Sequence, residues 1–207
     1  MVLGTRQRVL VLAVLGVAAP GAVLAWRWFH SGLGANPVEA LHHGLGQWTL
    51  RFLLGALAVS PIVRWAGVGW LMPARRVVGL AAFGYGVAHL VVWASLDYDW
   101  QWREILVEVL QRPFIAWGLA ALLLMTPLAL TSTRGAVRRL GGSRWRALHQ
   151  LIYPAAAAGV FHFMLKALPK EGPVPPAPYF AALLFLLSFR AFRRRPPARL
   201  RPPERQR

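Results

Sequence analysis

Long apolar runs separated by short polar and basic stretches dominate the chain. Six of these runs come close to the roughly 20 residues that an α-helix needs to cross about 30 Å of hydrocarbon. They cover residues 8–29, 48–66, 76–96, 113–130, 149–168 and 178–192. The pattern predicts an all-α membrane protein, a bundle of about six transmembrane helices that forms one domain over residues 1–192.

The first apolar run begins after basic residues and has small residues near Ala25, as a secretory signal peptide does. Its apolar stretch is long for such a peptide, however, and its removal would leave an odd number of helices. We therefore expect it to be a retained transmembrane helix.

Strongly basic connecting segments alternate along the chain with segments that are not strongly basic. The basic segments are the N-terminus, residues 64–76, residues 134–146 and the tail from Arg190 onward. Six of the seven carboxylates lie in the intervening loops, at Glu39, Asp97, Asp99, Glu104, Glu108 and Glu171. Because cytoplasmic loops of membrane proteins carry an excess of Lys and Arg, we expect both termini to be cytoplasmic and the protein to be a multi-pass protein of the bacterial inner membrane.

The formal net charge of +17 could by itself suggest a nucleic-acid-binding protein. The basic residues occupy alternate loops and the tail rather than one soluble face, and 57% of the residues are hydrophobic. We therefore expect membrane lipids as partners and no nucleic acid. The tail, residues 193–207, is rich in Arg and Pro, and we predict that it is disordered and lies against anionic lipid on the cytoplasmic side.

The chain contains no cysteine. Disulfides, iron–sulfur clusters, thiolate-ligated haem and covalently attached c-type haem are therefore excluded. Any redox metal must be held by His, Met or oxygen ligands.

Two histidines are predicted to lie within membrane helices at the same depth. His89 follows Arg76 by thirteen residues, which is about 20 Å along a helix. His162 follows His149, at the cytoplasmic start of its helix, by the same number. Ionisable side chains inside membrane helices are costly and mark functional sites by default, and two histidines on different helices can bind one haem iron from both faces.

Small residues precede both histidines, Gly79, Ala82 and Gly86 on one helix and residues 155–159 on the other. Small side chains let a flat macrocycle approach the backbone. Ordinary packing of small residues between membrane helices explains the glycines about as well, but it does not explain the imidazoles. We therefore interpret His89 and His162 as ligands of a b-type haem in the outer half of the membrane.

His149 is a candidate ligand of a second haem near the cytoplasmic face, although it could simply lie at the level of the lipid headgroups. On a straight helix it would point about 220° away from His162, but Pro154 lies between them and can change the helix phase. No histidine opposes His149 on the third helix. Arg75 and Arg76 lie there instead, and arginine is a good partner for haem propionates or a flavin phosphate.

His30, His42 and His43 are expected in or beside the first outer loop, where histidines are more often solvated than bound to metal. The sequence contains no Ser-His-Asp set, no HExxH motif, no P-loop and no dinucleotide-binding fingerprint. We therefore expect no catalytic residue, and an electron-transfer role rather than a catalytic one.

Several segments together resemble the haem-binding membrane subunit of the bacterial protein-methionine-sulfoxide reductase system, within the ferric-reductase-like transmembrane group. They are residues 32–38 (GLGANPV), Arg75-Arg76 followed by His89-Leu90, residues 131–133 (TST), and residues 145–153 (WRALHQLIY) with His162. The last of these is the most specific. The resemblance covers nearly the whole chain except the tail.

The resemblance implies a function that the residues alone do not. Members of that family pass electrons from the cytoplasmic side, a flavin reductase or the quinone pool, through b haem and reportedly FMN, to a periplasmic molybdopterin-containing reductase that repairs methionine sulfoxide in proteins. His89, His149 and His162 fall on the family's haem-associated positions. His43 falls on a recurring histidine without an assigned role, and no residue can be assigned to the flavin.

Two alternatives remain open. One is a ferric-reductase-like protein that reduces metal directly, although such proteins usually carry a cytoplasmic flavin and nicotinamide domain. The other is a haem-free transporter or assembly factor in which the histidines serve packing or proton transfer.

Overall fold

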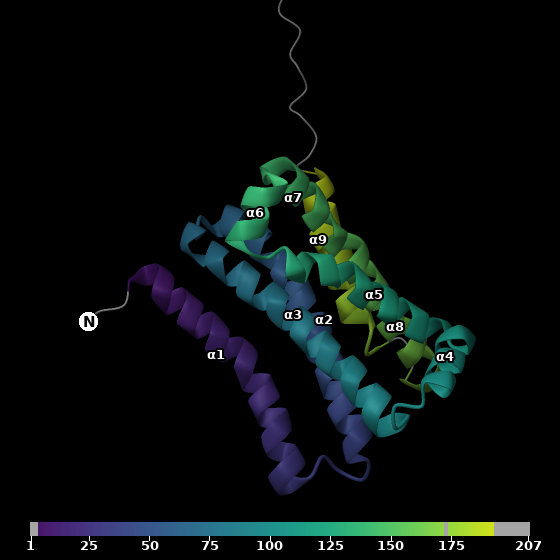
Figure 1. The fold of residues 1–207 in the computed structure, drawn as a ribbon. Coiled ribbons are helices and arrows are strands. Elements are labelled where there is room, and N and C mark those ends of the chain that lie inside the picture. Colours follow the sequence, from purple (N-terminus) through teal and green to yellow (C-terminus); the bar gives the residue numbers. More distant parts are fainter. Residues whose placement is uncertain (1–3, 172–173, 193–207) are drawn as a thin grey trace, which may run out of the picture.

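The computed structural model describes residues 4–171 and 174–192, which form helices, turns and short connections without a β-strand in these ranges (Figure 1). The predicted disordered tail, residues 193–207, lies outside the described residues. The prediction of an all-helical membrane protein is confirmed.

Five helices are long and apolar enough to cross a membrane in the part of the chain that the structure describes. They are α1 (Thr5–Trp26), α2 (Pro37–Ala66), α3 (Met72–Val92), α5 (Pro113–Leu130) and α8 (Ile152–Glu171). A turn of π-helix extends α1 (Arg27–Ser31) and α3 (Trp93–Asp97), and 3-10 turns precede α3 (Gly69–Leu71) and α8 (His149–Leu151). The sixth predicted segment forms α9 (Ala177–Phe192), which is apolar but shorter.

The N-terminal half of α2 differs from the prediction, because the helix begins at Pro37 rather than near residue 48. Asn36 caps it, with its side-chain oxygen accepting a hydrogen bond from the backbone N–H of Glu39 at 3.2 Å. Asparagine at the cap, proline in the first turn and an acidic residue at the positive end of the helix dipole are strong start signals. The prediction that His42 and His43 lie in a loop is therefore wrong, since both are on α2.

Three short helices complete the described chain. A ten-residue amphipathic helix, α4 (Trp102–Gln111), lies within the predicted third loop, and α6 (Arg134–Leu140) and α7 (Gly142–Leu148) form the basic connection between α5 and α8. Figure 1 shows α6 and α7 at one end of the bundle and α4 at the other. The acidic and basic connections that alternate in sequence therefore lie at opposite ends of the structure.

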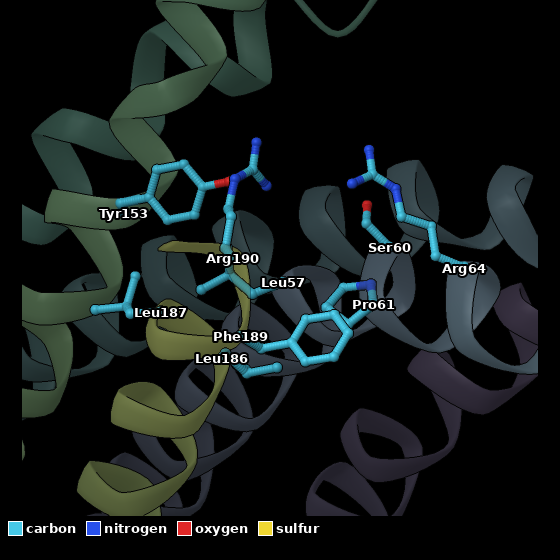
Figure 2. Close-up of a pocket in the computed structure, with 9 residues that line it drawn as sticks. All are labelled: Leu57, Ser60, Pro61, Arg64, Tyr153, Leu186, Leu187, Phe189 and Arg190. Carbon is cyan, nitrogen blue, oxygen red and sulfur yellow. The ribbon is translucent and has the colours of Figure 1, made fainter. Parts of the chain in front are cut away.

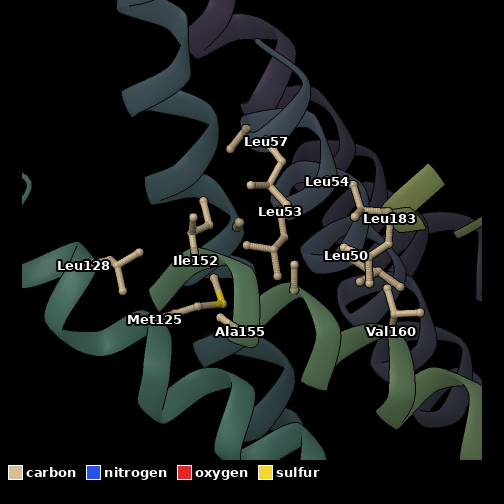
Figure 3. Close-up of a cluster of buried hydrophobic side chains, with 13 residues drawn as sticks. Leu50, Leu53, Leu54, Leu57, Met125, Leu128, Ile152, Ala155, Val160 and Leu183 are labelled. Carbon is tan, nitrogen blue, oxygen red and sulfur yellow. The ribbon is translucent and has the colours of Figure 1, made fainter. Parts of the chain in front are cut away.

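Two helix pairs, α2 with α3 and α5 with α8, form the centre of the bundle. Their shared core contains Leu50, Leu53 and Leu57 of α2 and Met125 of α5, and these side chains meet the face of α8 that carries Ala155 (Figure 3). Ala82 on α3 and Ala155 and Ala156 on α8 are completely buried. Small residues at these crossings let the backbones approach, which is how helices gain van der Waals contact in a membrane.

The first helix is peripheral. Among its residues only Val9 is buried, while α1 packs mainly along α3, where the hydroxyl of Tyr85 donates a hydrogen bond to the carbonyl of Val17 at 2.8 Å. A mostly exposed, apolar helix is expected where lipid covers the other faces.

Candidate functional site

A cavity of about 460 Å³ lies between α2, α3, α5 and α8, in the half of the bundle nearer to α4. Its wall is largely apolar, and Trp100, Trp102 and Ile105 of the α4 region lie at one side. Its basic lining residues are His42, His43, His89, His162 and Lys166. The volume is in the range of pockets that enclose a cofactor-sized molecule, so the cavity is a candidate ligand site within the membrane.

The structure brings His89 of α3 and His162 of α8 together across this cavity. Their ring centroids are 6.2 Å apart, and the ring planes are nearly perpendicular, at 82°. These are the two histidines that the sequence placed at one depth on different helices.

Each of these imidazoles is held by a backbone carbonyl of a neighbouring helix. The Nδ1–H of His89 donates to the carbonyl of His42 at 2.9 Å, and the Nδ1–H of His162 donates to the carbonyl of Phe114 at 2.6 Å. A carbonyl can only accept, so the proton of each neutral ring is on Nδ1 and the lone pair is on Nε2. This is the arrangement in which proteins present a histidine to a metal.

A glycine backs each imidazole, four residues after the accepting carbonyl. A Cβ at Gly46 would lie 2.9 Å from Cε1 of His89, and a Cβ at Gly118 would lie 2.8 Å from Nδ1 of His162. These distances leave no room for a side chain at either position. The same arrangement therefore occurs in the pair α2–α3 and in the pair α5–α8. In each pair, a glycine on one helix lets the histidine ring of the other helix lie against the backbone and donate to a carbonyl.

Sequence reasoning missed the parts of the site that come from α2, α5 and the C-terminal end of α8. The ring of His42 stacks on that of His89, with centroids 4.1 Å apart and planes 9° from parallel. His43 contacts Lys166, and its Nε2 lies 3.7 Å from a carboxylate oxygen of Glu39. The start signal at Asn36-Pro37 could have identified His42 and His43 as helical, but only the fold brings them to His89 and Lys166.

The other predicted site residues do not line this cavity. His149 lies at the opposite end, where its ring stacks on Trp145 at 3.9 Å. The hydroxyl of Thr131 donates to the carbonyl of Pro127 at 2.6 Å and therefore accepts from Nε2–H of His149 at 3.1 Å. Arg75 is half-buried near the same end of α3.

Two further residues are also outside the cavity lining. Arg76 is exposed beside Arg75. The ring of His30 stacks on Trp26, with centroids 3.7 Å apart.

The geometry fits a metal ion that receives most of its ligands from a cofactor and only two from the protein. No group of three or more His, Cys, Asp or Glu side chains suited to a metal ion occurs among the described residues. Two imidazoles are too few for a bare zinc-type site, but they suffice for iron in a porphyrin. Since imidazole nitrogen lies about 2 Å from a bound first-row metal, rings on opposite faces of one iron would have centroids roughly 6 Å apart, as His89 and His162 do.

Comparison with known proteins identifies the class. Residues 42–160 match the model of the ferric reductase like transmembrane component. Three similar curated proteins each bear the name protein-methionine-sulfoxide reductase heme-binding subunit MsrQ. The protein from Rhodospirillum rubrum is 48% identical over 163 residues, covering 77% of this chain and 75% of its own.

The relative from Azospira oryzae is 45% identical and covers 78% of this chain and 69% of its own. The relative from Caulobacter vibrioides is 40% identical, and the match covers 87% of this chain and 85% of the relative. The chain therefore belongs to the ferric-reductase-like transmembrane family, in the group formed by these MsrQ subunits. It is a multi-pass membrane protein, consistent with the bacterial inner membrane, and the resemblance noted from its sequence is confirmed.

Proposed function

We propose that this chain binds a b-type haem between His89 and His162. The proposal is that it passes electrons from the cytoplasmic side or the quinone pool to a periplasmic molybdopterin-containing reductase of protein methionine sulfoxide. The observation that carries the proposal is the pair of imidazoles, each fixed through Nδ1 to a carbonyl and 6.2 Å apart at a cavity of about 460 Å³. The names of the relatives support haem binding and a role in the protein-methionine-sulfoxide reductase system.

When bound, haem iron supplies a one-electron carrier that the side chains of this protein do not provide. His89 of α3 and His162 of α8 would hold the haem iron. The carbonyls of His42 and Phe114 keep both rings in one tautomer and one orientation, so little rearrangement accompanies a change of charge at the centre. Apolar side chains around the cavity exclude water and lower the local dielectric.

His43 and Lys166 lie on the side of the cavity that faces the α4 end of the bundle. In this proposal they are the cationic or hydrogen-bonding groups available to the propionates of the outer haem. Arg75 and Arg76 are proposed for the other end, as partners for the propionates of a second haem with His149 among its ligands, or for the phosphate of FMN. Support for FMN comes from the family resemblance alone.

The orientation follows from the charges in this proposal. The acidic α4 end faces the periplasm, and the end with α6 and α7, which carries Arg134, Arg138, Arg139, Arg144 and Arg146, faces the cytoplasm. The helix α9 then serves as a sixth crossing. Its 16 residues extend about 24 Å at 1.5 Å per residue, which nearly spans the hydrocarbon layer.

The absorption spectrum of the purified protein tests the function. We expect a Soret band and sharp reduced bands of b-type haem, with reduction by a quinol or a flavin reductase and reoxidation by the periplasmic reductase. A protein that inserts normally but purifies without haem from a haem-replete host would contradict the proposal and favour the haem-free alternative.

Reporter fusions test the orientation separately. Fusions at Asp99 and Glu171 should report the periplasm, and fusions at Gly141 and Arg199 should report the cytoplasm. A cytoplasmic signal at Asp99 would refute the inside–inside arrangement without bearing on the haem.

A further inference from the structure

A second cavity, of about 200 Å³, lies between α2, α8 and α9 at the end of the bundle that carries α6 and α7. One wall is apolar and is formed by Leu57, Pro61, Leu186, Leu187 and Phe189. The polar lining consists of Ser60, Arg64, Tyr153 and Arg190. Figure 2 shows the hydroxyl of Ser60 beside the guanidinium group of Arg64, whereas the guanidinium group of Arg190 lies next to Tyr153; both guanidinium groups point to the same side in this view.

The positive charge of this cavity has no nearby carboxylate among the described residues. Glu39, the carboxylates of residues 97–108 and Glu171 all belong to the opposite end of the helices, and both ion pairs formed within the described ranges are there. The guanidinium carbon of Arg190 lies 4.7 Å from the centroid of the Tyr153 ring. Arg75 repels both cavity arginines electrostatically. The site is therefore strongly favourable for an anion.

The hydroxyl of Ser60 is buried and has no hydrogen-bond partner in the described structure. By contrast, the hydroxyls of Ser95 and Ser132 each donate to the carbonyl four residues earlier at 2.6 Å. A buried hydroxyl without a partner is unfavourable. Ser60 and Arg64 are four residues apart on α2 and share one face, so an acceptor bound by Arg64 would also satisfy Ser60.

The size and the apolar wall restrict the ligand. The cavity is smaller than pockets that enclose a drug-sized molecule, which start at about 300 Å³, so a flavin ring or a quinone does not fit inside it. A phosphate group does fit, and two guanidiniums with a hydroxyl match its oxygens. The adjacent apolar wall suits acyl chains, and basic pockets between transmembrane helices bind such headgroups.

We propose that the Ser60–Arg64–Arg190 cavity binds the phosphate group of an anionic phospholipid, with its acyl chains along the wall formed by α9. The bound lipid would bridge α2 and α9 at the end of α9 whose last turn contains Arg190. This site is independent of the haem proposal.

The test is a titration of the full-length, delipidated protein in detergent with phosphatidylglycerol, phosphatidylcholine or inorganic phosphate. Native mass spectrometry counts bound lipid, and the melting temperature reports stabilisation. Wild type should retain one tightly bound phosphatidylglycerol and little phosphatidylcholine. R64Q and R190Q should each weaken phosphatidylglycerol binding about fivefold, and the double variant about thirtyfold.

The matched control is R138Q/R139Q, which removes two exposed arginines of α6 at the same end of the protein. It should change tight binding by less than about twofold. Ser60→Ala keeps the charges of Arg64 and Arg190 and should weaken phosphatidylglycerol binding severalfold. This variant replaces R64Q/R190Q as the test if the double variant does not fold.

Three results would overturn the proposal. The first is unchanged binding in R64Q/R190Q or, if that variant does not fold, in Ser60→Ala. The second is an equal loss in R138Q/R139Q, which would indicate diffuse surface charge. The third is saturation by inorganic phosphate with the affinity of phosphatidylglycerol, which would assign the site to free phosphate.

Discussion

The two ends of the bundle present their histidines in different ways. At the α4 end, His89 and His162 use Nδ1 to bind carbonyls and keep the Nε2 lone pair, and both line one cavity. At the α6–α7 end, His149 uses Nε2 itself to donate to Thr131 and lies flat on Trp145. Backbone carbonyls therefore orient His89 and His162 at the α4 end, whereas the side chains of Thr131 and Trp145 orient His149 at the other end.

The comparison shows that the group accepting the hydrogen bond from a histidine decides how firmly the ring is oriented before a ligand binds. A carbonyl in a packed helix cannot rotate, so the ring that binds it is oriented before any ligand arrives. A threonine hydroxyl can turn, and the His149 ring can release it at the cost of one hydrogen bond of about 1 kcal/mol. An inner haem would therefore need a rearrangement that an outer haem does not.

The largest expected effect is the loss of the outer haem ligands. His89→Ala and His162→Ala should each lower haem content about tenfold or more, because a single imidazole remains. Haem per protein from the pyridine haemochrome spectrum measures this, with membrane insertion checked by the yield of folded protein. Full haem content with unaltered spectra in both variants would remove the basis of the assignment.

The next effect tests the contribution of Gly46 and Gly118 separately from that of the two histidines. Gly118→Ala and Gly46→Ala place a Cβ 2.8 and 2.9 Å from the two imidazoles, so each ring must move away from its carbonyl. We expect altered haem bands, a shifted midpoint potential and haem affinity lowered roughly tenfold. Gly84→Ala is the matched control, since a Cβ there meets nothing within 4 Å. Equal effects at Gly84 would show general helix destabilisation instead.

A smaller effect is expected on electron delivery at the α4 end of the bundle. Asp99 and Glu104 are exposed there, whereas Glu108 already pairs with Arg112, whose Nη2 donates to it at 3.2 Å. Charged surfaces steer soluble redox partners, so D99N/E104Q should slow reoxidation by the periplasmic reductase severalfold at low salt and weaken the salt dependence. E108Q alone should do less. Unchanged kinetics at low salt would leave these carboxylates as solvated loop residues.

The smallest expected effect on the outer haem comes from the opposite end. His149→Ala should leave its content and bands within about 10% of wild type, because His149 is not part of that cavity. If a second haem is bound, the same variant should remove it, and a redox titration would lose one of two steps. A loss of both haems would show that the two ends are not independent.

Much of the fold could be predicted from apolar run length alone. The helix α5 begins at Pro113 and ends at Leu130, as the hydropathy pattern predicted. The start of α2 was missed because polar residues such as Asn36, Glu39 and His43 interrupt its first turns, although the capping signal was present in the sequence. Hydropathy detects long apolar stretches and misses helical residues that are polar.

The sequence alone determined that this is a membrane protein, which residue types could hold a redox metal, and that His89 and His162 occupy matching positions along two helices. Those conclusions depend on composition, spacing and the 1.5 Å rise of the helix. Only the tertiary structure decided that Gly46 and Gly118 back the two rings, that His42 stacks on His89, and that Arg64 and Arg190 share a cavity. These contacts join residues of different helices, and the angle and distance at which helices cross depend on packing, which no periodicity along one helix specifies.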